Sequence, residues 1–244
     1  ACFKGFYRLS KIIFRTFSKG RQHSFSFNSA ASVSFGNLSI FKFSLNLLKT
    51  NKKLENAFIL AVKRNNKNII EYFFEKVVGK GFQFSLKSAN KALNYSVMSK
   101  SSDLFIYLKE KFEGKCHISF NFSLIGDSLL RQSCKFCNFE AFKYIFEEIY
   151  PKTKREDFKV SLYFSEAVDS GSIELCQYLI DSKLYIDYNF LLNSLDQYSL
   201  INEDIVSLIV HNCNPSLKDQ LLHYYFNFSL QHKLYSLVEF LLKQ

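Results

Sequence analysis

One residue pattern recurs eight times along this chain of 244 residues, and it constrains the possible fold more than any other feature. Its clearest copy is the stretch AVDSGSIELCQYLI, residues 167–180, in which a small residue ends one short helix, Gly171 makes a turn and an apolar-striped helix follows. Successive copies are 27 to 37 residues apart. A period of this size predicts a solenoid of small helical units, each of which contacts only its neighbours.

Each copy is defined by a small residue, called position zero, which is Ala1, Ser32, Ala61, Ser96, Ser133, Ala167, Ser194 or Ser229. Positions +8, +11 and +12 share one helix face. Over the eight copies these are 24 residues, and all except Ser44 are apolar. In the seventh copy the three positions lie about three residues further along the chain. Position +11 is Tyr in four successive copies, at Tyr72, Tyr107, Tyr144 and Tyr178. A ring there is expected to pack between neighbouring units. If it does not, this register is wrong.

Position +4 is the predicted turn between the two helices of a unit. A helix that ends there favours a left-handed residue, which suits Gly5, Gly36, Gly171 and Asn65. Lys100, Cys137 and Lys233 suit it less, because a left-handed conformation costs such residues about 1 kcal/mol. A different end of the first helix is the alternative for those three units.

The order of these positions resembles the ankyrin repeat, most clearly at Ala167, Gly171, Glu174, Leu175, Tyr178 and Leu179. The Thr-Pro-Leu-His opening of ankyrin units is absent, and the hairpin after the second helix survives only as a remnant at residues 183–189. The tetratricopeptide repeat fits less well, since the chain has no Trp and only two Pro. The expected fold is therefore an all-α solenoid of ankyrin-like helix-turn-helix repeats, with β-hairpin fingers degenerate or absent. Diverged arrays of this kind are similar to those of protists and of large DNA viruses.

A single array is predicted over residues 1–244, with units at about 1–20, 21–50, 51–82, 83–115, 116–152, 153–183, 184–214 and 215–244. The first unit is truncated, and its missing helix predicts fraying over residues 1–20. Residue 1 is Ala rather than Met, so the chain is interpreted as a fragment or a processed product.

Charge is unevenly distributed, because residues 1–54 contain ten Lys and Arg and no Asp or Glu. Three interpretations are open for this segment: an organelle-targeting peptide, a surface for nucleic acid or an anionic membrane, or the basic end of the array. The last is favoured, because the repeat pattern runs through the segment. The six Cys lack disulfide-like spacing, which favours reduced thiols and a cytoplasmic location, with the nucleus as the alternative. No apolar run is long enough for a membrane span.

Three clusters of residues are candidates for a site of chemistry. Cys134-x-x-Cys137, with Cys116 and His117 upstream, lacks a zinc-finger spacing, and its residues are better explained as one core position and one turn position. His211, Cys213 and His223 lack a third group that would orient a nucleophile. The paired acids Glu147–Glu148 and Glu156–Asp157 lie beside basic residues, as in a solvated connector. We therefore expect no catalytic, metal or cofactor site.

The resemblance to ankyrin repeats implies a non-catalytic scaffold that binds a protein partner through a concave face made by the first helices. The residues expected to carry this binding are the exposed first-helix positions Lys63, Arg64, Asn94, Arg131, Gln132, Lys135, Glu166, Asp169, Asn227 and Gln231. Their charges are mixed and imply no single ligand charge. A monomer with an unidentified protein partner is expected, and nucleic acid bound by residues 1–54 is the alternative.

Overall fold

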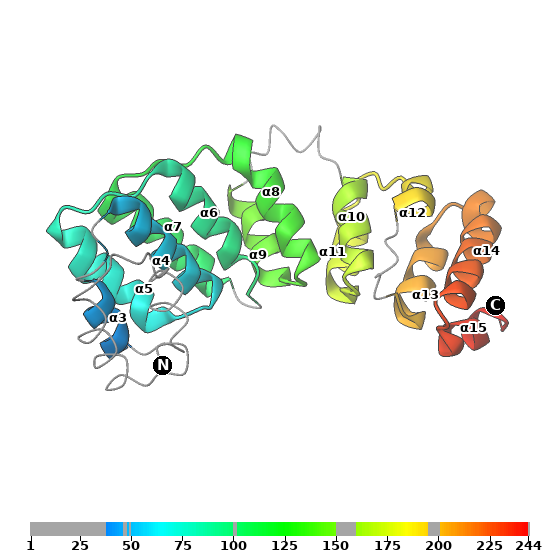
Figure 1. Ribbon diagram of the computed structural model, residues 1–244. Helices are drawn as coiled ribbons and strands as arrows, with labels where there is room; N and C mark the ends of the chain where they lie inside the picture. Colours follow the sequence, from blue (N-terminus) through cyan, green and yellow to red (C-terminus); the bar gives the residue numbers. More distant parts are fainter. Residues whose placement is uncertain are drawn as a thin grey trace. The chain divides into compact units, whose positions relative to one another are not determined.

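The computed structural model describes residues 38–45, 48, 50–99, 102–149, 160–194 and 201–243. The chain divides into two compact units, residues 1–121 and residues 122–244. Within the described ranges all regular structure is helical and there is no β-strand (Figure 1). The prediction of an all-α chain is therefore confirmed for these residues, and the hairpin remnant at 183–189 is a turn followed by the start of a helix. The predicted fraying over residues 1–20 lies outside the described part.

The N-terminal unit is built from pairs of helices joined by short turns. They are α3 (Leu38–Leu45), α4 (Asn51–Lys63), α5 (Lys67–Tyr72), α6 (Leu86–Ser96) and α7 (Asp103–Cys116), and α5 continues through a π-helical turn (Phe73–Val77) and a 3-10 turn (Val78–Lys80). α4 packs against both α5 and α6, and α3 packs against α5. Thr50 and Ser85 cap α4 and α6 by accepting a hydrogen bond from a backbone N–H in the first turn, which satisfies a donor that the helix leaves unpaired.

Phenylalanine rings fill the core of the N-terminal unit. The fully buried Phe58 of α4 contacts Phe73, Phe74, Phe84 and Phe112, with centroid separations between 4.7 and 5.9 Å. Most of these contacts are edge-to-face or tilted, the arrangement that the ring quadrupole favours. Because the five rings come from α4, the segment after α5, the loop before α6, and α7, this cluster holds both helix pairs together.

The C-terminal unit has the same kind of pairing. Its helices are α8 (Phe122–Lys135), α9 (Phe139–Tyr144) with a π-helical turn (Ile145–Ile149), α10 (Val160–Asp169), α11 (Ile173–Asp181), α12 (Tyr188–Ser194), α13 (Glu203–Asn212), α14 (Pro215–Gln231) and α15 (Tyr235–Leu241). α10 lies between α8 and α12, and α12 packs on α14. α13 in turn contacts α11 and α15 (Figure 1). Alternate helices thus form two layers within this unit.

Four helix ends, those of α4, α8, α10 and α14, share one turn. In each, the carbonyl of the small position-zero residue accepts a hydrogen bond from the N–H five residues later, at 2.8–3.0 Å, and the residue at +4 donates to the carbonyl three residues before it, at 2.9–3.2 Å. This is the Schellman arrangement, and its +4 residue must be left-handed. Those residues are Asn65, Cys137, Gly171 and Lys233, with φ of 52°, 52°, 75° and 58°.

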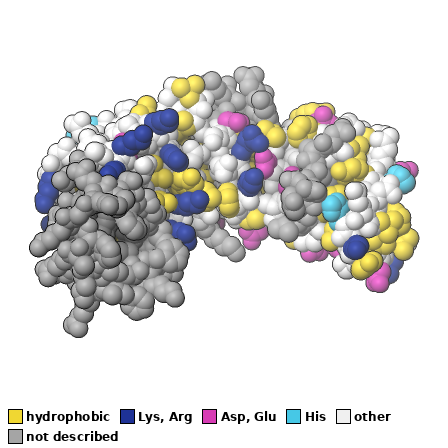
Figure 2. Space-filling model, viewed as in Figure 1, with side chains coloured by type: hydrophobic (Ala, Val, Ile, Leu, Met, Phe, Trp, Pro, Cys, Tyr) yellow, Lys and Arg dark blue, Asp and Glu magenta, His cyan; other side chains and the backbone are white. Residues whose placement is uncertain are grey.

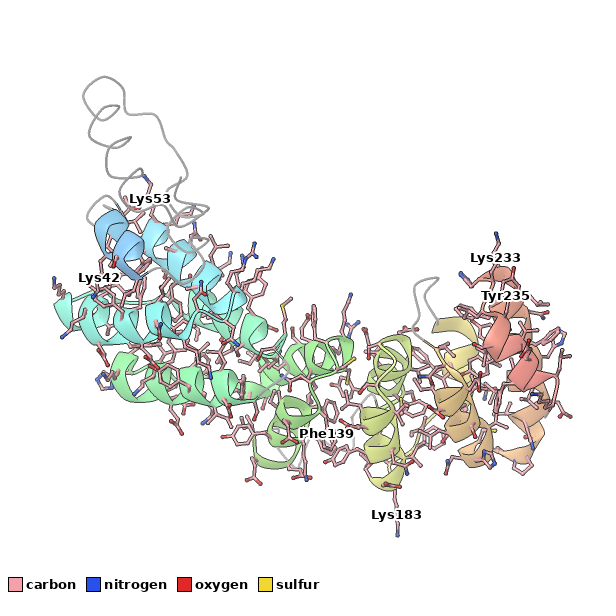
Figure 3. The ribbon with its side chains drawn as sticks, turned by 90° about the horizontal axis from the view of Figure 1, so that it is seen from below. Lys42, Lys53, Phe139, Lys183, Lys233 and Tyr235 are labelled. Carbon is pink, nitrogen blue, oxygen red and sulfur yellow. The ribbon has the colours of Figure 1, made fainter. Side chains whose placement is uncertain are left out.

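The alternative of a different helix end is therefore wrong for Cys137 and Lys233. Both residues are left-handed although neither is Gly, because the turn satisfies carbonyls that a helix end leaves unpaired, and this offsets a conformational cost of about 1 kcal/mol. Lys233 projects away from the ribbon at its turn, as does the left-handed Lys183 after α11 (Figure 3). Lys100 lies outside the described residues.

The tyrosines at position +11 pack as predicted wherever their contacts are defined. Tyr72 contacts Phe41 of α3 with the centroids 6.3 Å apart, and Tyr107 contacts Phe74 at 6.1 Å. Tyr178 contacts three rings of α9 and its π-helical turn, of which Phe139 is nearest at 5.6 Å. In each case the ring reaches the helix two before its own, or the extension of that helix, which is the contact that the pattern predicts.

Candidate binding surface

The ten predicted binding residues all lie on α4, α6, α8, α10 and α14 or directly after them. Lys63, Arg64 and Asn94 belong to the N-terminal unit and the other seven to the C-terminal unit. The exposed members are Lys63, Arg64, Lys135, Asn227 and Gln231, and the half-buried members are Asn94, Arg131, Gln132, Glu166 and Asp169. The predicted set is therefore divided between the two units, and an ion pair within it joins Arg131 to Glu166.

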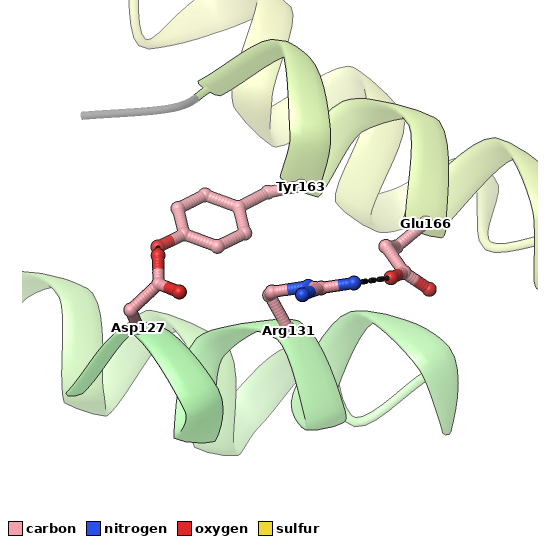
Figure 4. A network of polar contacts seen from close by, with 4 residues as sticks. All are labelled: Asp127, Arg131, Tyr163 and Glu166. Atoms are coloured by element: carbon pink, nitrogen blue, oxygen red, sulfur yellow. Dashed lines mark hydrogen bonds and ion pairs between the residues drawn. The ribbon is translucent and has the colours of Figure 1, made fainter. Parts of the chain in front are cut away.

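Two of the predicted binding residues bind each other. Arg131 of α8 and Glu166 of α10 form an ion pair with a nitrogen–oxygen distance of 2.7 Å, and their side chains are 43% and 21% exposed. The hydrogen bond that Arg131 donates to Glu166 raises the pKa of its guanidinium. One turn earlier the hydroxyl of the buried Tyr163 donates to Asp127 (Figure 4). These two contacts hold α8 to α10, so Arg131 and Glu166 have a packing role; a half-exposed pair of this kind contributes about 0–1 kcal/mol.

The polar residues of α14 interact mainly within their own helix or with the core. Asn227 lies one turn from His223, with Nδ2 3.0 Å from the Nε2 atom of the ring. The neighbouring Tyr225 is fully buried, and its hydroxyl has no hydrogen-bond partner among the described residues. Burial raises the pKa of this phenol, and the charge of Asp169 acts in the same direction. Asp169, a predicted binding residue, thus lies close enough to the Tyr225 hydroxyl to influence its ionisation.

A second set of residues on the N-terminal unit was missed from the sequence. Lys87 and Lys91 are exposed on α6, and Tyr95 follows one turn later. The Nζ atoms of Lys91 and of Lys63 from α4 lie 5.9 and 5.3 Å from the centroid of the Tyr95 ring. The spacing of Lys87, Lys91 and Tyr95, four residues apart each time, places them on one helix face and was the signal available in the sequence.

A shallow pocket of about 230 Å³ lies between α5 and α7 in the N-terminal unit. Its lining is Lys67, Ile70, Glu71, Asp103, Leu104 and Tyr107. Burial raises the pKa of Tyr107, and the carboxylates of Glu71 and Glu75 add to that effect. The ionisable groups of this lining are the amine of Lys67, the carboxylates of Glu71 and Asp103, and the phenol of Tyr107.

The residues of the three candidate clusters that the structure describes lie in the core, at a turn or on the surface of a helix. Cys134 is buried in the core, and burial raises the pKa of its thiol. Cys137 is exposed at the turn. The two residues thus occupy one core position and one turn position, as the pattern predicts. His211 contacts the carbonyl of Ser207 on its own helix at 2.6 Å. No group of three or more His, Cys, Asp or Glu residues that could hold a metal exists among the described residues. Glu147 accepts a hydrogen bond from Tyr178 and is exposed; Glu156–Asp157 lies outside the described part.

No helix among the described residues is long and apolar enough to cross a membrane. No protein-family model, curated protein or solved structure matches the chain. The resemblance to ankyrin repeats therefore rests on the residues quoted from the sequence.

Proposed function

We propose that the chain is a non-catalytic scaffold of ankyrin-like helix-turn-helix repeats that binds a protein partner through its first helices. The observation that carries this proposal is the shared turn of α4, α8, α10 and α14. Four segments with different residues at the turn adopt the same hydrogen bonds at the same position of the pattern. A structural unit that recurs in this way, although its side chains differ, is expected of a repeat array.

Packing within each unit supports the same proposal. The position-zero residues Ala61, Ser96, Ser133, Ala167 and Ser229 are all fully buried, as close approach of neighbouring helices requires. From residue 51 onward, each proposed unit contains one pair of helices. First helices contact first helices, α4 with α6 and α8 with α10, and second helices contact second helices, α11 with α13. In such stacks each unit packs on its neighbours, and the remaining face of the first helices stays open for a ligand.

The first helices therefore present the residues that packing has not used. Of the predicted set, the exposed Lys63, Arg64, Lys135, Asn227 and Gln231 are the strongest candidates, since Arg131 and Glu166 pair with each other. We propose that the scaffold acts in the cytoplasm as a monomer. The alternative of nucleic acid or membrane binding by residues 1–54 concerns a segment that lies largely outside the described residues.

Site-specific photo-crosslinking tests this proposal. A benzophenone side chain is introduced at Arg64 or Asn227 on the first helices, and at the exposed Glu75 or Glu239 on the second helices as matched controls. After irradiation in an extract of the source cell, discrete adducts are expected from the first-helix positions and not from the controls. Equal labelling of both sets, or the absence of a discrete adduct from either first-helix position, would refute binding through the first helices.

A further inference from the structure

The charges of the N-terminal unit are divided between its two helix layers. Residues 1–121 contain 21 Lys and Arg and 6 Asp and Glu, a net charge of +15. Five of the six acids lie on the second helices and their extensions: Glu71, Glu75, Asp103, Glu110 and Glu113. The sixth, Glu55 of α4, accepts a hydrogen bond from the backbone N–H of Ser85 at 2.6 Å. The first helices α4 and α6 thus carry bases with almost no compensating charge.

The centre of this basic layer is a tyrosine ring shared by two lysines. Lys63 approaches Tyr95 from α4 and Lys91 approaches it from α6, with Nζ–centroid distances of 5.3 and 5.9 Å. The attraction of the ring for both ammonium groups holds two like charges close together. Arg64 follows Lys63 directly, and Lys87 lies one turn before Lys91. In Figure 2, Lys and Arg side chains gather around a hydrophobic patch over α6.

None of these four cations forms an ion pair with a carboxylate of its own unit. The ion pairs among the described residues join Lys109 to Glu113 and Arg131 to Glu166. No Asp or Glu that could pair with these cations occurs in the undescribed part of the N-terminal unit, which is residues 1–37, 46–47, 49 and 100–101. Lysines four residues apart on a helix, such as Lys87 and Lys91, repel each other and lower helix stability. The contacts with the Tyr95 ring offset part of this repulsion, but no carboxylate of the unit neutralises the four charges, so they are available to an anionic ligand.

We propose that Lys63, Arg64, Lys87, Lys91 and Tyr95, here called the α4–α6 basic surface, dock an acidic segment of a partner protein. This inference rests on the proposed function and specifies the partner chemistry of its N-terminal part. Carboxylates of the segment pair with the four cations, and complementary charge accelerates the encounter and fixes the orientation. The sign of the first-helix charges, which is mixed over the whole chain, is positive in this unit apart from Glu55.

A peptide ligand fits this surface better than a nucleic acid does. Bases of single strands stack on open aromatic rings, whereas the Tyr95 ring already has the ammonium groups of Lys63 and Lys91 against it. Arg64 is the one guanidinium among the four cations, so bidentate contacts are few with either ligand, and the contacts of the ring are the observation that separates the two.

Fluorescence anisotropy with a labelled peptide of about twelve Glu, and with a single-stranded oligothymidine of similar charge, tests the proposal at about 0.15 M salt. The Lys63→Glu/Lys91→Glu variant should weaken peptide binding by roughly tenfold or more. The matched variant Lys76→Glu/Lys80→Glu makes the same charge change at exposed positions after α5, and should weaken it less than about threefold. The conservative Lys63→Arg/Lys91→Arg variant should retain binding, and thermal melting of each variant verifies the fold.

Three results would overturn the proposal. Equal losses in the two Glu variants would mean that the peptide senses only net charge. Tighter binding of the oligothymidine, lost with Lys63 and Lys91, would assign the surface to nucleic acid. A dimer of the wild-type chain that dissociates in the Lys63→Glu/Lys91→Glu variant, measured by sedimentation, would make a second copy the occupant. None of these results affects photo-crosslinking from Asn227 in the C-terminal unit, so failure of this inference is distinguishable from failure of the proposed scaffold function.

Discussion

Replacement of Gly171 by Ala tests the turn on which the repeat interpretation depends. Gly171 has a φ of 75°, and its N–H and that of Ser172 close the end of α10. A left-handed conformation costs a residue with a Cβ about 1–2 kcal/mol, while the smaller conformational freedom of Ala in the unfolded chain returns about 0.4–1 kcal/mol. The net loss of stability is therefore about 1 kcal/mol, which lowers the melting temperature of a chain of this size by about 2–4 °C.

Gly114→Ala is a matched control with the opposite sign. Gly114 lies inside α7, and no atom lies within 4 Å of a Cβ added there. Ala in a helix interior is more stable than Gly by about 0.5–1 kcal/mol, so this variant should melt at a higher temperature than the wild type. Far-UV circular dichroism during heating and in urea measures both variants. The contrary result is that Gly114→Ala is stabilised but Gly171→Ala is as stable as the wild type. That result would show that position +4 is not left-handed at this turn and that the shared register is wrong.

Three further predictions concern buried and ionisable groups. Tyr225→Phe should raise the unfolding free energy by about 1 kcal/mol in a urea titration, because it removes a buried hydroxyl without a hydrogen-bond partner; a loss would indicate that the hydroxyl is satisfied. Burial acts to raise the pKa of Glu55, but hydrogen bonds from Ser85 and Ser88 lower it overall. The ionised Glu55 therefore stabilises the fold above the unfolded pKa of about 4.3, and this contribution is lost as the pH falls through the pKa of the folded chain. Glu55→Gln should reduce the free energy of unfolding at pH 7 and make it depend less on pH in the acid range. Cys137 is exposed and should react with a maleimide in the native chain. Cys134 and Cys176 should react only after unfolding, because both are buried and burial raises the pKa of their thiols, that of Cys176 to about 12. Peptide mass spectrometry measures the labelling of each.

The buried faces of the helices could be predicted because they follow a local rule. Positions +8 and +12 are buried in the described copies, as at Leu175 and Leu179, since residues four apart lie on one helix face. The burial pattern is less regular in α14, where the apolar residue three before position zero is Phe226. The structure buries Tyr225 fully and leaves Phe226 half-buried. Hydrophobicity alone favours burial of Phe over Tyr, so the residue that is buried follows from the contacts of α14 with α12, α13 and α15.

The turns show where residue preference is a weak guide. Cys137 and Lys233 are poor left-handed residues, yet both take that conformation, because the hydrogen bonds of the turn and the packing of position zero fix the backbone around them. The sequence signal that remains is positional: each of these residues lies four after a small buried residue, Ser133 or Ser229. Register therefore predicts these turns better than the identity of the turn residue does.

The surface could not be predicted from single copies, because its availability depends on the charges of neighbouring copies. Arg131 and Glu166 are 35 residues apart and opposite in sign, so they pair and are used in packing. Lys63 and Lys91 also come from neighbouring helices, but they are alike in sign, so they meet only at the ring of Tyr95 and keep their charges available. In a stack of helices an exposed charge is free for a partner only where the adjacent copy offers no opposite charge. By this rule the N-terminal unit, with few acids on α4 and α6, is the part of the described chain best prepared to bind an anionic ligand.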